Sequence, residues 1–180
     1  RMLQEQLKLP IFIEKDVNLL LFGDYTALNL SGIKNAIGFY IGTGFGCALM
    51  INGKIYKGAH GFAGELSHVP LKGHSGDCTC GNSGCLELYG AGRSVVERSA
   101  AKGVPVYEFF THPTTQDEVQ DFLEYVIAAM LTTINIVDPE LVIIGGGVVD
   151  MDGFPWEGLV SSLRSRLRSP LLKDRLEIAR

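Results

Sequence analysis

The sequence predicts an α/β fold built on a mixed sheet, and three observations carry this prediction. Residues 36–58 hold segments rich in Ile, Phe and Tyr that are separated by glycines, as in antiparallel strands. Residues 115–138 repeat apolar side chains at helical spacing. The apolar segment 141–147 ends in three glycines and precedes another amphipathic stretch, which indicates a strand followed by a crossover helix. Antiparallel and parallel pairing therefore meet in one sheet with flanking helices.

Composition limits the class of protein. The chain has 180 residues, of which 46% are hydrophobic and 20% charged, with a net charge of −4. This balance is typical of a globular protein of one or at most two domains. The 16 basic residues form no basic run, which argues against nucleic acid or an anionic membrane as partner. No apolar run approaches the ~20 residues that span a bilayer, and no signal-peptide core begins the chain, so we expect a cytoplasmic protein.

The first predicted elements are a strand at residues 9–17 and a helix at residues 19–32. LPIFIEKDVN alternates apolar and polar side chains and enters a polar turn at Asp16 and Asn18. LLLFGDYTALNLSG has a helical pattern that Gly32 would end. The polar groups of the turn would then lie at the carboxyl end of the strand.

Residues 36–58 predict a three-stranded antiparallel meander. The turn Asn52-Gly53 between apolar segments is the strongest short-range hairpin signal, because both residues accept positive φ. The earlier turn has the sequence GTGFG. Residues 58–84 are rich in Gly, His and Cys and lack a period, which predicts an ordered loop that needs an internal clamp.

Helices are predicted for most of the remaining chain. The first covers residues 86–103 and ends at Gly103, and the second covers residues 115–138 with a capping box formed by Thr115 and Glu118. A buried strand follows in LVIIGGG, and residues 156–169 form a further amphipathic helix.

The three clustered cysteines indicate a metal site. Cys78, Cys80 and Cys85 lie within eight residues, and in a reducing compartment such a cluster favours metal over disulfides. Tetrahedral Zn²⁺ needs a fourth ligand, which a histidine can supply. Three reduced cysteines in a loop are the plain alternative. The candidate fourth ligands are His60, His68, His74 and His112, and spacing does not choose between the first three.

The glycine-rich turns are candidates for nucleotide binding. In Gly42-Thr43-Gly44-Phe45-Gly46, backbone N–H groups and the Thr43 hydroxyl could hold a phosphate, although a plain β-turn explains the same residues. The turn is neither a Walker loop nor a Rossmann fingerprint. Gly145, Gly146 and Gly147 follow a strand, where α/β sheets bind ligands, or they simply turn the chain.

Four polar residues bracket the cysteine loop. Asp16 closes the first predicted strand, Glu65 and His68 are three residues apart, and Glu87 follows the last cysteine by two residues. Carboxylates and imidazole suit a polyhydroxyl ligand because they exchange hydrogen bonds with hydroxyls. Each of them alone is more typical of a solvated surface residue.

Taken in order, the motifs EKDVN, IGTGFG, GAHGFAGELSHVPL, CTCGNSGCLE and DPELVIIGGGVV resemble those of the ROK family of sugar kinases and repressors. The likeness covers essentially the whole chain and is greatest to the family's D-allose kinases. It implies a ribonuclease-H/actin-like ATPase fold with two lobes and a zinc-stabilised loop. It also implies ATP-dependent phosphorylation of the primary hydroxyl of a hexose, with Mg²⁺ and a structural Zn²⁺, in a cytoplasmic homodimer.

The resemblance implies a role for each motif residue. Asp16 would be the catalytic base, and Lys15, Asp16, Glu65, His68 and Glu87 would contact the sugar. The phosphate and adenosine elements would be Gly42, Thr43, Gly44, Gly46, Gly145, Gly146 and Gly147. The zinc ligands would be His68, Cys78, Cys80 and Cys85.

The chain departs from the family pattern in two ways. Lys15 stands where family kinases commonly have Asn, which is compatible with an allose-like substrate. The Asp-x-Gly-x-Thr phosphate loop of the N-terminal lobe does not occur, so we expect residues 1–18 to be the interlobe strand and catalytic turn, and residues 19–180 the C-terminal lobe without its last helices. Alone, this chain would have little or no kinase activity. A sugar-sensing repressor with a winged helix and a zinc-stabilised binding module are the competing interpretations.

Overall fold

The computed structural model describes residues 2–168 and 175–180, and in this part of the chain five strands form one sheet in the order β3-β2-β1-β4-β5. β2 is antiparallel to β1 and β3, whereas β4 is parallel to β1 and β5. The predicted mixed α/β sheet is therefore confirmed. The strands are β1 (Ala36–Ile41), β2 (Phe45–Ile51), β3 (Lys54–Ile55), β4 (Leu141–Gly145) and β5 (Glu177–Ala179).

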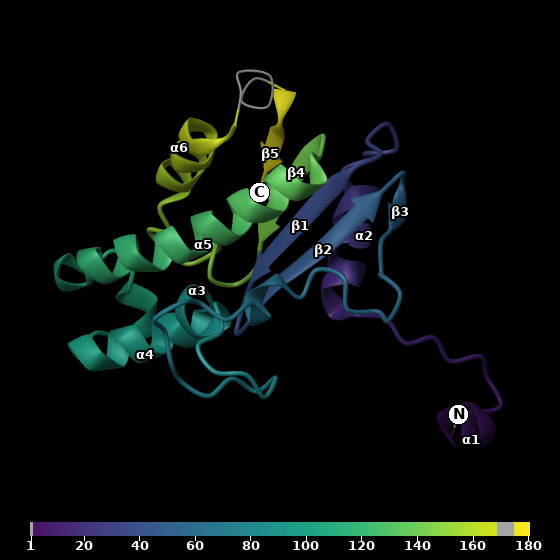
Figure 1. Cartoon of the computed structure of the whole chain (residues 1–180), viewed down its shortest axis with the longest axis horizontal. Helices are drawn as coiled ribbons and strands as arrows, with labels where there is room; N and C mark the ends of the chain where they lie inside the picture. The colour runs from purple at the N-terminus through teal and green to yellow at the C-terminus, as the bar shows by residue number, and fades with distance from the viewer. Residues whose placement is uncertain (1, 169–174) are drawn as a thin grey trace.

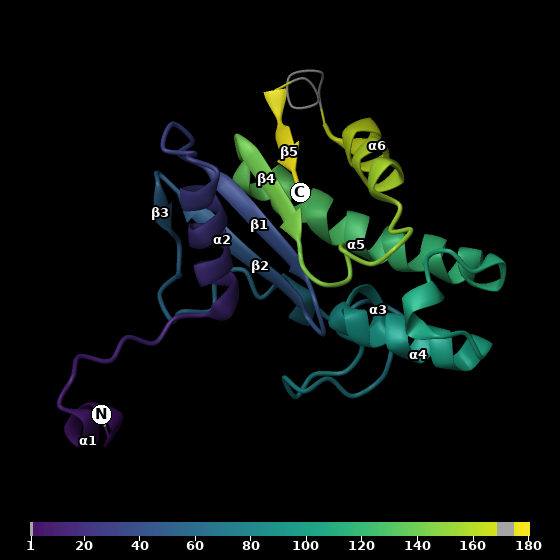
Figure 2. The ribbon, with the colours of Figure 1, turned by 180° about the vertical axis from the view of Figure 1, so that it is seen from behind.

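Helices cover both faces of the sheet. Figures 1 and 2 show α2 on one face and the long α5, with α6 beside it, on the other. α1 lies apart from the sheet at the end of an extended segment (Figure 1). The α-helices are α1 (Met2–Leu7), α2 (Asp16–Ala27), α3 (Glu87–Gly90), α4 (Gly92–Lys102), α5 (Gln116–Val137) and α6 (Trp156–Arg166). The 3-10 turns are η1 (Leu66–His68), η2 (Val106–Glu108) and η3 (Pro113–Thr115).

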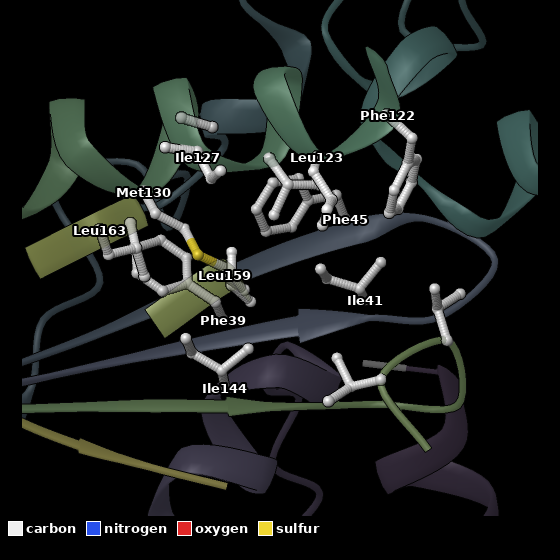
Figure 3. Close-up of a cluster of buried hydrophobic side chains, with 14 of the residues drawn as sticks. Phe39, Ile41, Phe45, Phe122, Leu123, Ile127, Met130, Ile144, Leu159 and Leu163 are labelled. Carbon is white, nitrogen blue, oxygen red and sulfur yellow. The ribbon is translucent and has the colours of Figure 1, made fainter. Parts of the chain in front are cut away.

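The main hydrophobic core lies between the sheet and α5. Figure 3 shows side chains of α5 pointing onto Phe39, Phe45 and Ile144 of the strands, with α6 closing one side. The helical spacing predicted for residues 115–138 explains this packing, because it places one apolar stripe against the sheet. The predicted stripe residues that are buried are Val119, Phe122, Leu123, Val126, Ile127, Met130 and Ile134.

The second face carries a smaller core under α2. Val17 and Leu21 pack against Tyr40, Met50 and their neighbours in the strands. The outward side of the same helix is also apolar and remains exposed, at Leu19, Leu20 and Phe22.

Several local predictions are confirmed. The meander forms β1, β2 and β3, and Asn52 and Gly53 both have positive φ, of 52° and 73°. LVIIG forms β4, and Gly103 ends α4 in the left-handed conformation. The helix predicted for residues 156–169 forms as α6 but ends earlier, at Arg166, because Leu167 is extended, and Ser169 lies outside the described residues.

The strand predicted for residues 9–17 is wrong. This segment is extended up to Lys15, but it pairs with no strand among the described residues, and α2 already begins at Asp16. Phe12 and Ile13 are both 91% exposed. The alternating pattern of side chains was not sufficient, because a strand also needs a neighbouring strand that accepts and donates its backbone hydrogen bonds.

Other helix predictions differ from the structure in detail. α2 begins earlier than residue 19 and ends before Gly32, because Asn29 takes a positive φ of 53°. The helix predicted for residues 86–103 is broken at Ala91, which is extended and precedes a tight approach of Gly92 to the strand edge. The capping box is absent at Thr115, since its hydroxyl donates to the carbonyls of residues 109 and 112 instead. None of the helices in the described part of the chain is both long and apolar enough to cross a membrane.

Candidate functional site

A cleft of about 500 Å³ opens at the carboxyl end of β1, beside the start of α2. Its walls come from the starts of α2 and α3, the turn between β1 and β2, η1 and the segment after β4. Ligands of α/β sheets bind at such carboxyl ends. The sequence-predicted residues that line the cleft are Lys15, Asp16, Gly42, Thr43, Gly44, Gly46, Glu65, His68, Glu87, Gly146 and Gly147.

Asp16 reaches the cleft because α2 starts very close to β2. A Cβ on Gly46 would lie 2.2 Å from Cγ1 of Val17, so the glycine lets the helix start sit against the strand. Oδ1 of Asp16 accepts a hydrogen bond of 2.8 Å from the N–H of Val17. Its other carboxylate oxygen has no hydrogen-bond partner among the described residues, and the side chain is exposed. One oxygen of Asp16 is thus available to a ligand.

Lys15 and Glu65 face each other across the cleft wall. Nζ of Lys15 lies 2.7 Å from Oε1 of Glu65 and donates a 3.0 Å hydrogen bond to the carbonyl of Ala63. The other oxygen of Glu65 lies 3.7 Å from Nε2 of His68. Because the ammonium and the carboxylate neutralise each other, this wall carries little net charge and suits hydrogen bonds with a neutral ligand.

Glu87 is the first residue of α3, and its carboxylate is held by a residue that sequence reasoning missed. Oγ of Ser67, a buried side chain in η1, donates a 3.2 Å hydrogen bond to Oε2 of Glu87, and the N–H of Phe45 lies 3.5 Å from the same oxygen. A Cβ on Gly44 would come within 3.0 Å of that oxygen. These contacts fix one oxygen and leave the other for a ligand.

The loop of residues 58–84 and Cys85, which follows it directly, bring together one histidine and three cysteines. The candidate ligand atoms of His68, Cys78, Cys80 and Cys85 all lie within 4.8 Å of one another. Nδ1 of His68 lies 3.5 Å from Sγ of Cys78, and the sulfurs of Cys80 and Cys85 are 3.6 Å apart. In a tetrahedral zinc site with Zn–S bonds near 2.3 Å, neighbouring sulfurs are about 3.8 Å apart. The four residues therefore fit a zinc ion.

The electrostatics of the cluster also favour a cation. Burial and the neighbouring sulfurs raise the pKa of Cys85, whereas the backbone N–H of Asn82 lowers the pKa of Cys80. Several thiolates this close repel one another, so a divalent cation is the natural counter-charge. Nδ1 of His68 faces the cluster while Nε2 faces Glu65 in the cleft.

His74 is absent from the cluster for a visible reason. Its ring contacts those of Tyr89 and Tyr125, at centroid distances of 4.5 Å and 5.5 Å. The hydroxyl of Tyr89 also donates a 2.5 Å hydrogen bond to the carbonyl of Ser75. This aromatic contact anchors the cysteine loop to α3 and α5.

An apolar groove of about 530 Å³ adjoins the cleft. It shares Gly42, Thr43 and Gly147 with the cleft, so the glycine turn separates the two spaces. Sequence reasoning had identified only the shared residues. The remaining groove residues are Gly92, Arg93, Val95, Val96, Val106, Val148 and Met151.

Close backbone approaches build this dividing turn. The N–H of Gly92 donates a 2.9 Å hydrogen bond to the carbonyl of Gly42, and a Cβ on Gly92 would lie 2.2 Å from that oxygen. Gly146 has a φ of 104° and crosses the end of β1, where its Cβ would lie 2.6 Å from the carbonyl oxygen of Ile41. Gly145, by contrast, faces the ring of Tyr40 and does not line the cleft.

Cys47, the cysteine outside the cluster, is a cleft residue that the sequence did not explain. Its side chain is only 1% exposed, and burial raises the pKa of its thiol to about 12. The thiol therefore stays protonated and serves as a small apolar wall. Tyr40, another cleft residue, donates a 2.7 Å hydrogen bond to Asp24 and so links β1 to α2.

The fold and the site together define an α/β protein with a ligand cleft beside a Cys-His cluster. A model of the ROK family matches residues 1–179. The chain belongs to the ROK family, as its motifs predicted.

Individual relatives include both enzymes and regulators. The glucokinase of Halalkalibacterium halodurans is 30% identical over 170 residues, which cover 81% of this chain and 51% of the glucokinase. The xylose repressor of Bacillus subtilis is 27% identical over 176 residues, which cover 94% of this chain and 46% of the repressor. The chain thus spans about half the length of these curated relatives.

A solved structure shares the fold over nearly the whole chain. The ROK family glucokinase of Streptomyces griseus, crystallised with glucose and AMPPNP, matches with a TM-score of 0.81 at 23% identity. The match covers 98% of this chain and 64% of that glucokinase.

Proposed function

We propose that the full-length protein is an ATP-dependent kinase that phosphorylates the primary hydroxyl of a hexose. The observation that carries this proposal is that two binding spaces meet at one glycine turn, the polar cleft with Asp16 and the apolar groove. Phosphoryl transfer needs an acceptor and a nucleotide on opposite sides of the transferred group. Membership of a family that includes glucokinases supports the reaction class.

The cleft would hold the sugar. Glu65, His68 and Glu87 present oxygen and nitrogen atoms from one loop and from α3, and each has an atom fixed by another protein group. Carboxylates accept and imidazole exchanges hydrogen bonds with hydroxyls, so the set suits a neutral polyol. Asp16 would accept the proton of the primary hydroxyl as that oxygen attacks the γ-phosphoryl group of ATP.

The groove would take the adenine base, since its apolar lining includes four valines and a methionine. The phosphates would then run along the shared glycine turn, where Thr43 offers a hydroxyl and the glycines expose N–H groups. Mg²⁺ bound with ATP would neutralise charge on the phosphates.

Zinc would be structural in this mechanism. His68, Cys78, Cys80 and Cys85 would hold it and so fix the loop that carries Glu65 and His68. With Nδ1 on the metal, Nε2 of His68 carries the proton and can donate to Glu65 or to a sugar hydroxyl.

The hexose that we propose is D-allose, on the basis of Lys15. Its ion pair with Glu65 puts a cation at one edge of the cleft and changes the hydrogen bonds available to one sugar hydroxyl. Allose and glucose differ at one hydroxyl, so a residue at the cleft edge can separate them. The resemblance of the sequence motifs to those of D-allose kinases also supports this sugar.

A coupled ADP-release assay on the full-length protein tests the function. We expect turnover with ATP, Mg²⁺ and a hexose, with allose preferred over glucose, mannose and N-acetylglucosamine. Asp16→Asn should reduce kcat by about 100- to 1,000-fold and leave sugar affinity nearly unchanged, because only the base is lost. Near-normal turnover of that variant would remove Asp16 from the role.

A second candidate is a sugar-sensing repressor, which the match to a xylose repressor favours. The shared region would then bind sugar without chemistry. Absence of turnover with every sugar, together with measurable sugar binding and specific binding to operator DNA, would support the repressor function.

Under the kinase proposal the protein is a cytoplasmic homodimer without nucleic-acid or membrane partners. Residues 19–180 form its C-terminal lobe, and this 180-residue chain alone has little or no activity.

A further inference from the structure

The two residues that precede Asp16 are both joined to the segment of residues 57–65. Glu14 forms an ion pair with Lys57, and Lys15 pairs with Glu65 at the other end of that segment. Neither Glu14 nor Lys57 lines the cleft. The start of α2 is therefore held from outside the cleft by one pair and at its wall by the other.

The carboxylate of Glu14 is fully engaged. Besides Lys57, the side-chain amide of Asn18 donates to it at 2.8 Å and the N–H of Lys15 at 3.1 Å. These donors, Lys57 first, lower its pKa to about 2, so it is an anion throughout the neutral range. Such a carboxylate cannot exchange protons in catalysis and acts as a fixed link between α2 and Lys57.

Lys57 follows β3, and hydrogen bonds to β2 and to the loop fix the backbone next to it although its side chain is 56% exposed. The N–H of Tyr56 donates a 2.8 Å hydrogen bond to the carbonyl of Leu49 in β2, and the N–H of Ala63 donates at 3.1 Å to the carbonyl of Lys57. Gly64 passes directly over β2 with a φ of 84°, and a Cβ at this position would clash with the carbonyl oxygen of Cys47 at 2.2 Å.

Residues 2–13 form no ion pair with the rest of the described chain. The extended segment that leads into α2 pairs with no strand among the described residues, and α2 packs on the sheet through Val17 and Leu21 beyond Asp16. We propose that the Glu14–Lys57 ion pair is a positioning device that holds the first turn of α2, and with it Asp16, in register with the cleft. This inference rests on the proposed kinase function, in which Asp16 is the base.

Substitution of Lys57 in the full-length protein tests the device. Lys57→Met should lower kcat about tenfold and change the sugar KM less than twofold, because a small misplacement of a reacting group slows chemistry more than binding. Lys57→Arg should restore most of kcat. Glu14→Gln should lower kcat similarly, and the double variant should lose no more than either single variant. Lys54→Met is the matched control, since Lys54 is an exposed lysine of the same hairpin with no ion pair among the described residues.

Hydrogen exchange separates this inference from the function it rests on. The N–H groups of Asn18 and Leu19 donate to the carbonyl of Lys15 in the first turn of α2. Their exchange should accelerate in Lys57→Met and not in Lys54→Met, whether or not the protein has kinase activity. Equal kcat in the two lysine variants of an active enzyme would overturn the inference, and so would equal exchange if the wild type is inactive.

Discussion

The layer under α5 and the loop of residues 58–84 are held in place by different forces. Under α5, large side chains such as Phe39, Phe122 and Ile127 are fully buried, so stability is spread over many apolar contacts. The loop buries few side chains and turns through glycines with positive φ, while its two cysteines meet His68 and the adjoining Cys85 at one point. Loss of one contact should therefore weaken the layer gradually and the loop abruptly.

Removal of the proposed zinc should have the largest effect. Chelation, or Cys85→Ser, should weaken sugar binding on the order of 100-fold, because the loop that carries Glu65 and His68 loses its clamp and with it charged hydrogen-bond partners of the sugar. The far-ultraviolet circular dichroism should change little, since the sheet and α5 do not depend on the cluster. Sugar titration by calorimetry, with and without chelator, measures the difference.

The cysteine outside the cluster provides the control. Cys47→Ser should keep one zinc per chain by elemental analysis, whereas Cys85→Ser should lose it. Zinc-free protein that binds sugar normally would show that the loop is held by its turns and by the contacts of His74 with Tyr89 and Tyr125 alone.

A substitution in the core under α5 should lower the stability of the fold and leave sugar affinity unchanged, the reverse of zinc removal. Phe122→Ala removes a ring that packs on Phe109 and Phe110 and should cost about 3–5 kcal/mol of unfolding free energy in urea titrations. Ile136→Ala, on the same helix but 77% exposed, should change it by less than about 0.5 kcal/mol. Under conditions where both variants stay folded, sugar affinity should be unaffected. A cost as small for Phe122 as for Ile136 would contradict the role of this layer.

The same contrast explains how far the sequence could predict the fold. The patterns of apolar side chains place α5, β4 and the meander correctly, because α5 buries one apolar stripe and β1 and β4 are buried along nearly their whole length. The segment 9–17 shows the limit, since alternation describes the side chains but not whether the backbone finds a partner. At Thr115 the sequence predicts a capping box, in which the hydroxyl would accept from an N–H of the helix. In the structure the hydroxyl instead donates to two carbonyls of the preceding turn.

Residues of the site could be predicted only where they form a recognisable pattern in the sequence. Clustered cysteines and the carboxylates around them stood out by spacing, and family motifs selected His68. Ser67 carried no signal, because a serine gains a role only when folding brings Glu87 beside it. The same holds for the groove valines, which look like core residues in the sequence. Gly46 was predicted as part of the glycine turn, but its close contact with Val17 was not.

Ser67 gives a smaller, local test within the loop. Ser67→Ala removes the donor to Oε2 of Glu87 and should raise the sugar KM about 5- to 10-fold, the worth of one hydrogen bond of about 1 kcal/mol, with kcat within twofold. Zinc content should stay at one per chain. Ser75→Ala, an exposed serine of the same loop, should leave KM unchanged, and an equal effect of both serines would point to general loosening of the loop.

The smallest expected effect is a pH dependence that separates two surface carboxylates on opposite faces of the sheet. Contacts of Glu14, chiefly with Lys57, lower its pKa from 4.5 to about 2, and the Arg166 guanidinium beside Glu124 lowers the pKa of that carboxyl too. A depressed folded-state pKa stabilises the protein above the unfolded-state value, and this contribution is lost as the pH falls through the folded-state value. The difference in unfolding free energy between wild type and Glu14→Gln should thus be constant above about pH 5 and shrink between pH 4.5 and 2.

Urea titrations at pH 6, 4 and 3 measure this difference, and for Glu124→Gln it should also shrink as the pH falls. Only Glu14→Gln should also speed hydrogen exchange at the start of α2, because only Glu14 adjoins Asp16, and a flat pH response would mean that the Lys57 contact does not persist in solution.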